Sequence, residues 1–146
     1  MLHALVRHSH FLSEVFRVKY SILTNNPMVS DKFSSSHEVL FCDTSAKEIL
    51  GKAAEMIAEG DTILNHPLYG SVKPNETPYR TILLKKKGDP SFTQITKEES
   101  TELIVKALRT YEKFTDKKGQ IPPDVLKDYQ FVDLALASSA VESADR

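Results

Sequence analysis

The residues from His66 to Arg80 contain the densest group of side chains in this sequence that could bind a ligand or transfer a proton. Three prolines interrupt the segment, HPLYGSVKPNETPYR, and each proline fixes its own φ angle and restricts the residue before it. We therefore expect a stiff loop, which loses little conformational entropy when it binds a ligand. Its candidate ligand-binding residues are His66, Gly70, Ser71, Lys73, Asn75, Glu76, Thr77 and Arg80.

A second polar stretch, Thr24-Asn25-Asn26-Pro27, follows a β-rich run. Asn is a favoured N-cap and Pro is favoured at the first helical position, so the stretch predicts a turn from a strand into a helix. The first backbone N–H groups of such a helix attract an anion. Asn25 and Asn26 are therefore further candidate ligand-binding residues.

The two stretches are expected to meet at one edge of a sheet. If the strands before them are parallel neighbours, their carboxyl ends lie together, and open α/β sheets usually bind ligands at that edge. There Lys73 and Arg80 would supply positive charge, while His66 and Glu76 would act as donor and acceptor. This arrangement predicts a pocket for a small anionic or zwitterionic molecule, walled by both stretches.

Each candidate also has a purely structural interpretation. A histidine at a strand end is often satisfied by a backbone carbonyl, the two asparagines can serve only as caps, and the loop charges can be solvated surface groups. Tyr69 and Tyr79 are expected to pack the loop, and Cys42, in an apolar strand, is expected to be an inert buried thiol. At this level the ligand site and these structural roles both stay open.

The common short motifs of catalysis and cofactor binding do not occur in the sequence. It contains no GxGxxG, GxxxxGK[ST], HExxH or GxSxG, and we expect no cofactor. His3, His8 and His10 could suggest a metal, but they are loosely spaced near a terminus, whereas ligand clusters need a rigid frame. We therefore expect no metal site.

The composition disfavours several classes of partner. The chain of 146 residues suits one domain, and its 19 Lys and Arg against 20 Asp and Glu give a net charge of -1, whereas nucleic-acid binding normally needs a basic face. The single cysteine cannot form an internal disulfide, which favours the reducing cytoplasm. No apolar run approaches the ~18 residues of a membrane span. We expect a cytoplasmic protein with no nucleic-acid or membrane partner.

Hydrophobic patterning predicts short strands that alternate with helices. The expected strands cover residues 18–24, 38–42, 61–65 and 79–85. Asn26-Pro27 begins a short helix, and the capping boxes Ser45-Ala-Lys-Glu48 and Thr96-Lys-Glu-Glu99 begin two longer ones. A last helix after Pro123 carries an apolar stripe of Val125, Tyr129, Val132 and Leu136.

This order of elements predicts an α/β fold, a three-layer sandwich with a short, mostly parallel four-stranded sheet and helices on both faces. No helical pattern links residues 65 and 79, so strand 79–85 either runs antiparallel or follows a long irregular crossover. We expect an N-terminal extension at 1–17, a single α/β domain at 18–137 and a frayed C-terminal tail at 138–146.

Two longer strings, ILTNNPMVSDKF from Ile22 to Phe33 and HPLYGSVKPNETPYRTILL from His66 to Leu84, resemble the GrdX family. The likeness spans about Val18 to Phe114. The family consists of small proteins encoded beside the glycine reductase genes of amino-acid-fermenting anaerobic bacteria. It supplies no established catalytic residues to transfer, so the positions that match its motifs are candidates only: Asn25, Asn26, Pro27, His66, Pro67, Gly70, Ser71, Lys73, Pro74, Asn75, Glu76, Thr77 and Pro78.

The resemblance implies a pathway more than a mechanism. Glycine reductase uses selenocysteine and paired thiols, which a chain with one cysteine cannot supply. The first interpretation is a non-catalytic accessory protein of the glycine reductase system that binds a small anionic ligand. One alternative is a small enzyme with His66 as general acid or base and Lys73 or Arg80 holding an anionic substrate. The other is an interaction module whose loop docks a glycine reductase subunit.

Overall fold

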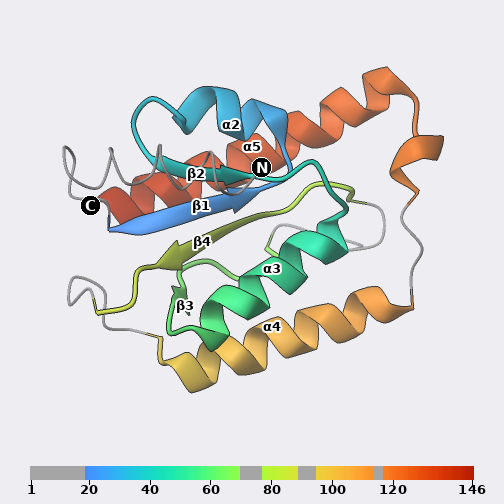
Figure 1. The fold of residues 1–146 in the computed structure, drawn as a ribbon. Coiled ribbons are helices and arrows are strands. Elements are labelled where there is room, and N and C mark those ends of the chain that lie inside the picture. The colour runs from blue at the N-terminus through green and yellow to red at the C-terminus, as the bar shows by residue number, and fades with distance from the viewer. Residues whose placement is uncertain (1–18, 70–76, 89–94, 114–116) are drawn as a thin grey trace.

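The computed structural model describes residues 19–69, 77–88, 95–113 and 117–146, so the expected extension at 1–17 lies outside it. The described elements are strands and helices of one α/β fold, as predicted (Figure 1). The strands are β1 (Tyr20–Thr24), β2 (Glu38–Phe41), β3 (Thr62–Ile63) and β4 (Thr81–Lys85). The helices are α2 (Pro27–Phe33), α3 (Ala46–Ala58), α4 (Lys97–Glu112) and α5 (Pro123–Asp145), with a 3-10 turn at Lys118–Gln120.

The four strands form one mixed sheet in the order β2-β1-β4-β3. β1 runs parallel to β2, whereas β4 runs antiparallel to both β1 and β3. The prediction of a mostly parallel sheet was therefore wrong. The described residues between β3 and β4 form turns rather than a crossover helix, so the chain reverses and β4 returns alongside β3.

Strand β3 is shorter than the run of residues 61–65 predicts, because a side chain takes over its pairing with β4. Leu64 N still donates to Leu83 O at 2.8 Å. Beyond it, Asn65 Oδ1 accepts from Leu83 N at 2.8 Å and Asn65 Nδ2 donates to Thr81 O at 3.0 Å. The Asn65 amide thus replaces backbone groups in the ladder and holds the turn after β3 against β4.

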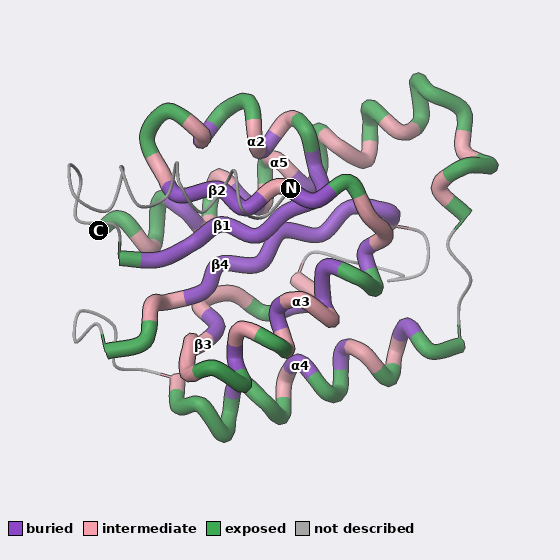
Figure 2. The backbone as a smooth tube through the Cα atoms, viewed as in Figure 1, coloured by how far each residue is buried: buried purple, intermediate pink, exposed green. Residues whose placement is uncertain are grey.

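Alternate strand residues contribute to two hydrophobic clusters, as the two-residue period of a strand requires. Leu23, Ile82 and Leu84 belong to a cluster with residues of α3 and α4. Ile22 and Leu83 belong to a second cluster with residues of α2 and α5. The buried strands β1 and β4 run through the middle of the molecule between these helices (Figure 2).

The three predicted helix starts are confirmed by their caps. The side chains of Asn26, Ser45 and Thr96 each accept a hydrogen bond from a backbone N–H in the first turn of α2, α3 and α4. Such a bond satisfies one of the N–H groups that a helix start leaves without a partner. These local signals fix where the chain turns from the sheet edge into each helix.

The face of helix α5 that packs against the sheet is not the face that carries its predicted apolar stripe. Its buried residues are Asp133, Ala137 and Val141, whereas Val125 and Val132 are 37% and 55% exposed. The predicted stripe through Val125 and Val132 was therefore wrong. The small Ala137 lets the helix approach the sheet, and the hydrogen bonds of Asp133 fix its rotation.

The end of α5 is held against the start of the domain. Tyr20 donates its hydroxyl hydrogen to Asp145 Oδ1 at 2.6 Å, and His37 Nε2 lies 2.9 Å from Asp145 Oδ2. Lys32 Nζ donates to Ser138 Oγ at 2.9 Å. Residues 138–145 are consequently helical, where the sequence alone suggested a frayed tail.

Candidate ligand-binding site

Asn25 joins the two polar stretches that the sequence placed at one edge of the sheet. Its Oδ1 accepts from Arg80 N at 2.9 Å, and its Nδ2 donates to Pro78 O at 2.9 Å and to Thr44 O at 2.8 Å. The residue is fully buried. A buried amide with three such bonds is well satisfied, so Asn25 fixes the residues before β4 against the carboxyl end of β1.

Asn26 combines a capping role with a contact to the last helix. Its Oδ1 accepts from Met28 N at 3.0 Å, which caps α2. Its Nδ2 donates to Asp133 Oδ2 at 3.0 Å and to Gln130 O at 2.9 Å. The capping interpretation of Asn26 thus holds in the structure, and the same amide also ties α5 to this edge.

Asp133 is a buried carboxylate that accepts hydrogen bonds from three neutral donors. Besides Asn26, Thr81 Oγ1 donates to Oδ2 at 2.8 Å and Tyr69 donates its hydroxyl hydrogen to Oδ1 at 2.9 Å. Thr81 Oγ1 in turn lies 2.8 Å from Thr24 Oγ1. Asp133 is only 3% exposed, and a buried carboxylate needs such bonds to remain charged. Residues of β4, of the cap of α2 and of the turn after β3 therefore converge on one carboxylate of α5.

Arg80 is the second buried charge at this edge, with an exposed fraction of 1%. Its Nε donates to the Tyr111 hydroxyl oxygen at 2.9 Å, and its Nη1 donates to Tyr69 O at 3.2 Å. The guanidinium carbon lies 5.9 Å from the centre of the Tyr111 ring. The buried Nη2 has no hydrogen-bond partner among the described residues. An unsatisfied buried N–H is rare in native proteins and requires a physical explanation.

Burial and the charges of Asp133 and Arg80 shift the pKa values of Tyr69 and Tyr111. Burial, with the nearby Asp133 carboxylate, raises the pKa of Tyr69 well above its ordinary value, and Arg80 opposes this only partly. Burial also raises the pKa of Tyr111, against the lowering effect of the Arg80 charge. Both phenols therefore stay protonated at neutral pH and retain a hydroxyl hydrogen to donate.

Of the remaining ligand-binding candidates from the sequence, only His66 and Thr77 are among the residues that the structure describes. His66 is exposed, and its Nδ1 accepts from Leu68 N at 3.1 Å. Thr77 is partly buried beside Pro78. Gly70, Ser71, Lys73, Asn75 and Glu76 lie outside the described residues.

Two residues that were expected to be structural are deeply buried. Tyr79 is 2% exposed and accepts at its hydroxyl oxygen from Gln130 Nε2 at 2.8 Å. Cys42 is 1% exposed, and burial raises the pKa of its thiol. A raised pKa disfavours the thiolate, which is the nucleophilic form, so Cys42 behaves as a core residue.

Two residues that complete the site were not among the sequence candidates. Tyr111 lies on the buried face of α4, and its contact with Arg80 depends on where β4 lies. Asp133 was not singled out at all. Its only signal in the sequence is its spacing. Asp133 lies four positions before Ala137 and eight before Val141, which puts all three on one helical face.

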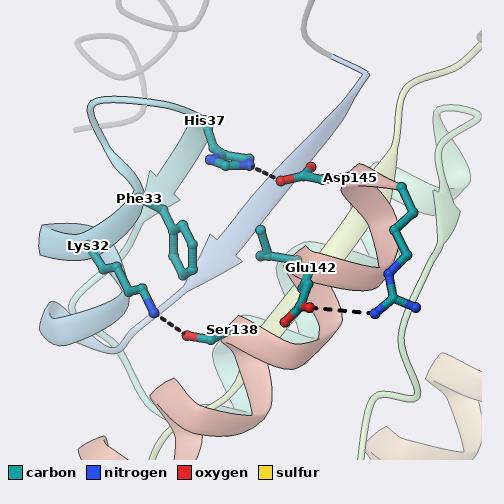
Figure 3. A pocket seen from close by; sticks show the side chains of 8 residues that line it. Lys32, Phe33, His37, Ser138, Glu142 and Asp145 are labelled. Atoms are coloured by element: carbon teal, nitrogen blue, oxygen red, sulfur yellow. Dashed lines mark hydrogen bonds and ion pairs between the residues drawn. The ribbon is translucent and has the colours of Figure 1, made fainter.

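A separate hollow of about 440 Å³ lies between α2 and the last turns of α5 (Figure 3). Phe33 and Val141 supply apolar lining, and the polar residues around it bond to one another. The pairs are Lys32 with Ser138, His37 with Asp145 and Glu142 with Arg146. The first two pairs hold α5 against residues 32–37, and none of these residues belongs to the predicted site.

The described part of the chain contains no group of three or more His, Cys, Asp or Glu that could hold a metal ion. None of its helices combines the length and the apolar character that crossing a membrane requires.

Fold and site together define a small α/β domain with a buried arginine and a buried aspartate at one edge of a mixed sheet. The family model described as GrdX-like protein matches residues 21–142. The chain therefore belongs to the GrdX-like protein family, which associates it with glycine reductase. The match extends beyond Phe114, where the sequence resemblance ended, and includes Asp133. Neither the curated proteins nor the solved structures contain a match.

Proposed function

We propose that this protein is a non-catalytic accessory component of the glycine reductase system in amino-acid fermentation, and that it binds a small anionic or zwitterionic ligand. The ligand site is the edge formed by residues 24–27 and 66–80. Membership of the GrdX-like family supports the pathway. The direct bonds between Asn25 and both Pro78 and Arg80, which bring the two stretches together, support the position of the site.

The rigidity of this edge favours ligand binding. Asn25, Asn26 and Thr24 are fully buried and bonded to groups from distant parts of the chain. A site built on such fixed groups does not have to be ordered when the ligand arrives, and less binding free energy is lost. Arg80 adds a permanent positive charge, which selects a ligand with an anionic group.

The surroundings of the titratable candidates favour a non-catalytic role. A general base must reach the proton that it abstracts, but His66 is exposed and its Nδ1 is engaged by Leu68 N. The Cys42 thiol is buried in the core beside α3. Ligand recognition, rather than bond making, is the chemistry that the described groups suit best.

Thermal unfolding of the purified full-length protein tests this function. We expect glycine, acetyl phosphate or inorganic phosphate to raise the Tm in a saturable way, because a ligand that binds only the folded state stabilises it. Sodium chloride at equal ionic strength is the control. If none of the three raises the Tm more than the salt, or if turnover is found and is lost in His66→Ala, the proposal is overturned.

Docking of a glycine reductase subunit is a second candidate, which one observation favours. The first half of α5 exposes Phe131 and Val132, at 59% and 55%, and Figure 1 shows this half extending past the end of the sheet. Exposed apolar groups of this kind often mark contacts with another protein. We expect co-purification with a reductase subunit to be lost in Phe131→Ser/Val132→Ser if this candidate holds, and unchanged if it does not.

A further inference from the structure

The hydrogen bonds of Arg80 leave one nitrogen of the guanidinium unused. Nε is taken by the Tyr111 hydroxyl and Nη1 by Tyr69 O. Nη2 shares one edge of the planar group with Nε, whose single N–H is already bonded to Tyr111, so this edge of Arg80 is half occupied. A carboxylate or phosphate usually binds arginine through two nitrogens of one edge, and on this edge only Nη2 remains for it.

The charge of Arg80 is also incompletely balanced. No carboxylate of the described residues lies within ion-pair distance of the guanidinium, and Asp133 is occupied by Asn26, Thr81 and Tyr69. Leaving a buried cation without a contacting anion is unfavourable. Among the described residues, Nη2 of Arg80 thus contacts neither a hydrogen-bond acceptor nor a carboxylate.

From this buried, unpartnered nitrogen we infer that Arg80 Nη2 is the anion-binding atom of the site, and that it contacts a single oxygen of a small oxyanion. This inference rests on the proposed function, since it names the ligand chemistry of the same edge. Carboxylates and phosphates share the required oxygen. Tyr111 and Tyr69 are positioning residues, because their hydrogen bonds hold the guanidinium plane, and the Tyr111 hydroxyl prevents a two-oxygen contact at the Nε–Nη2 edge.

Two variants separate this single-oxygen contact from a general charge effect. Arg80→Lys keeps the positive charge but removes the planar group. Tyr111→Phe keeps the ring and removes the hydroxyl oxygen that occupies Nε, which opens the Nε–Nη2 edge to both oxygens of a carboxylate. Arg109→Lys, at an exposed position of α4, is the matched control for the arginine substitution.

Calorimetric titration of the wild-type protein and these variants with sodium acetate, glycine and inorganic phosphate provides the test. We expect Arg80→Lys to bind about tenfold more weakly or worse, Arg109→Lys to match the wild type, and Tyr111→Phe to bind acetate at least as tightly as the wild type. Binding of acetate and glycine alone identifies a carboxylate ligand, and binding of phosphate alone identifies a phosphate ligand.

A nitrogen-15 NMR spectrum of the Arg80 side chain covers the case in which Arg80→Lys does not fold. Its Nε–H signal is expected to shift saturably on addition of the probe that binds. If the wild type binds a probe while the Nε–H signal of Arg80 does not shift, or if Tyr111→Phe binds acetate more weakly than the wild type, a buried water satisfies Nη2 and the inference is wrong. If the wild type binds none of the three probes, the proposed function itself fails.

Discussion

Tyr69 donates its hydroxyl hydrogen to Asp133 Oδ1 at 2.9 Å, although 64 positions separate the two residues in the chain. The backbone oxygen of the same tyrosine accepts from Arg80 Nη1 at 3.2 Å. One residue therefore contacts both buried charges of the sheet edge. This contact fixes the turn after β3 between β4 and α5, and it makes the stability of the domain depend on the two charges.

Replacing Asp133 should cause the largest loss of stability among single changes at this edge. Asp133→Ala leaves Asn26, Thr81 and Tyr69 without their acceptor and leaves Arg80 without a nearby negative charge. We expect unfolding in urea to show a loss of about 3–5 kcal/mol. Asp128→Asn, at an exposed position on the same helix, should change stability by less than about 0.5 kcal/mol. Similar small losses in both variants would contradict the account of Asp133.

The pKa of Tyr69 predicts how stability changes at alkaline pH. Burial and Asp133 hold this pKa well above its ordinary value, whereas the unfolded chain ionises at about pH 10. Above pH 10 the unfolded state alone loses the proton, so stability falls as pH rises. Tyr69→Phe should be less stable than the wild type by about 1–2 kcal/mol at pH 9, and the difference should shrink at pH 11.

The control for this alkaline effect is Tyr129→Phe, which lies on α5 and is only partly buried. Its unfolding free energy should differ little from the wild type at pH 9. A Tyr69→Phe variant with the same deficit at both pH values would show that the ionisation of Tyr69 is not coupled to folding.

The end of α5 should be held by Asp145 rather than by the neighbouring surface ion pair. Asp145 accepts from the buried Tyr20 hydroxyl and contacts His37 (Figure 3). Asp145→Ala should destabilise the protein by about 1–2 kcal/mol and speed hydrogen exchange in the last turns of α5. Glu142→Ala removes only the exposed pair with Arg146, which is worth about 0–1 kcal/mol. Faster exchange in Glu142→Ala than in Asp145→Ala would reverse this assignment.

Replacing Asp61, unlike the substitutions above, should stabilise the protein at neutral pH. Burial raises the pKa of its carboxyl despite the hydrogen bond from Lys87 N at 3.1 Å. In the unfolded chain this carboxyl loses its proton at about pH 4. The native state holds the proton to a higher pH, so the free energy of unfolding falls as pH rises above that value. Asp61→Asn keeps an acceptor for Lys87 N and should raise the Tm at pH 7, with no gain near pH 3.

An exposed aspartate is the reference for that measurement. Asp31→Asn, on α2, removes the same charge without a buried carboxyl and should leave the Tm almost unchanged at both pH values. A lower Tm for Asp61→Asn at pH 7 would mean that the native state favours the charged carboxyl.

Local chemistry made much of the fold predictable from the sequence. The capping residues Asn26, Ser45 and Thr96 lie at the observed helix starts, since a cap depends only on its own neighbours. The direction of β4 was not predictable, because it depends on which strand it joins after a connection with no helical period. The rotation of α5 was not predictable either, because a buried helix face is predicted from large apolar residues. That criterion selects Val125 and Val132 over the small Ala137.

The contact between the two polar stretches was predictable, but the other residues around that contact were not. Both polar stretches follow strands, and a strand end is where loop residues of distant segments meet. Asp133 and Tyr111 come from long helices whose packing depends on the whole fold. Arg80 was chosen as a surface charge that could bind a ligand, and its burial becomes visible only when β4 pairs with β1 in the centre of the sheet.

The most direct test of the ligand site is a backbone NMR titration of the full-length protein with glycine, acetate and inorganic phosphate. The account predicts saturable shifts in the amide signals of Asn25, Asn26, Tyr69 and Arg80, with the signals of His37 and Glu142 unchanged. Saturable shifts confined to the hollow between α2 and α5, or no saturable shift with any of the three, would contradict it.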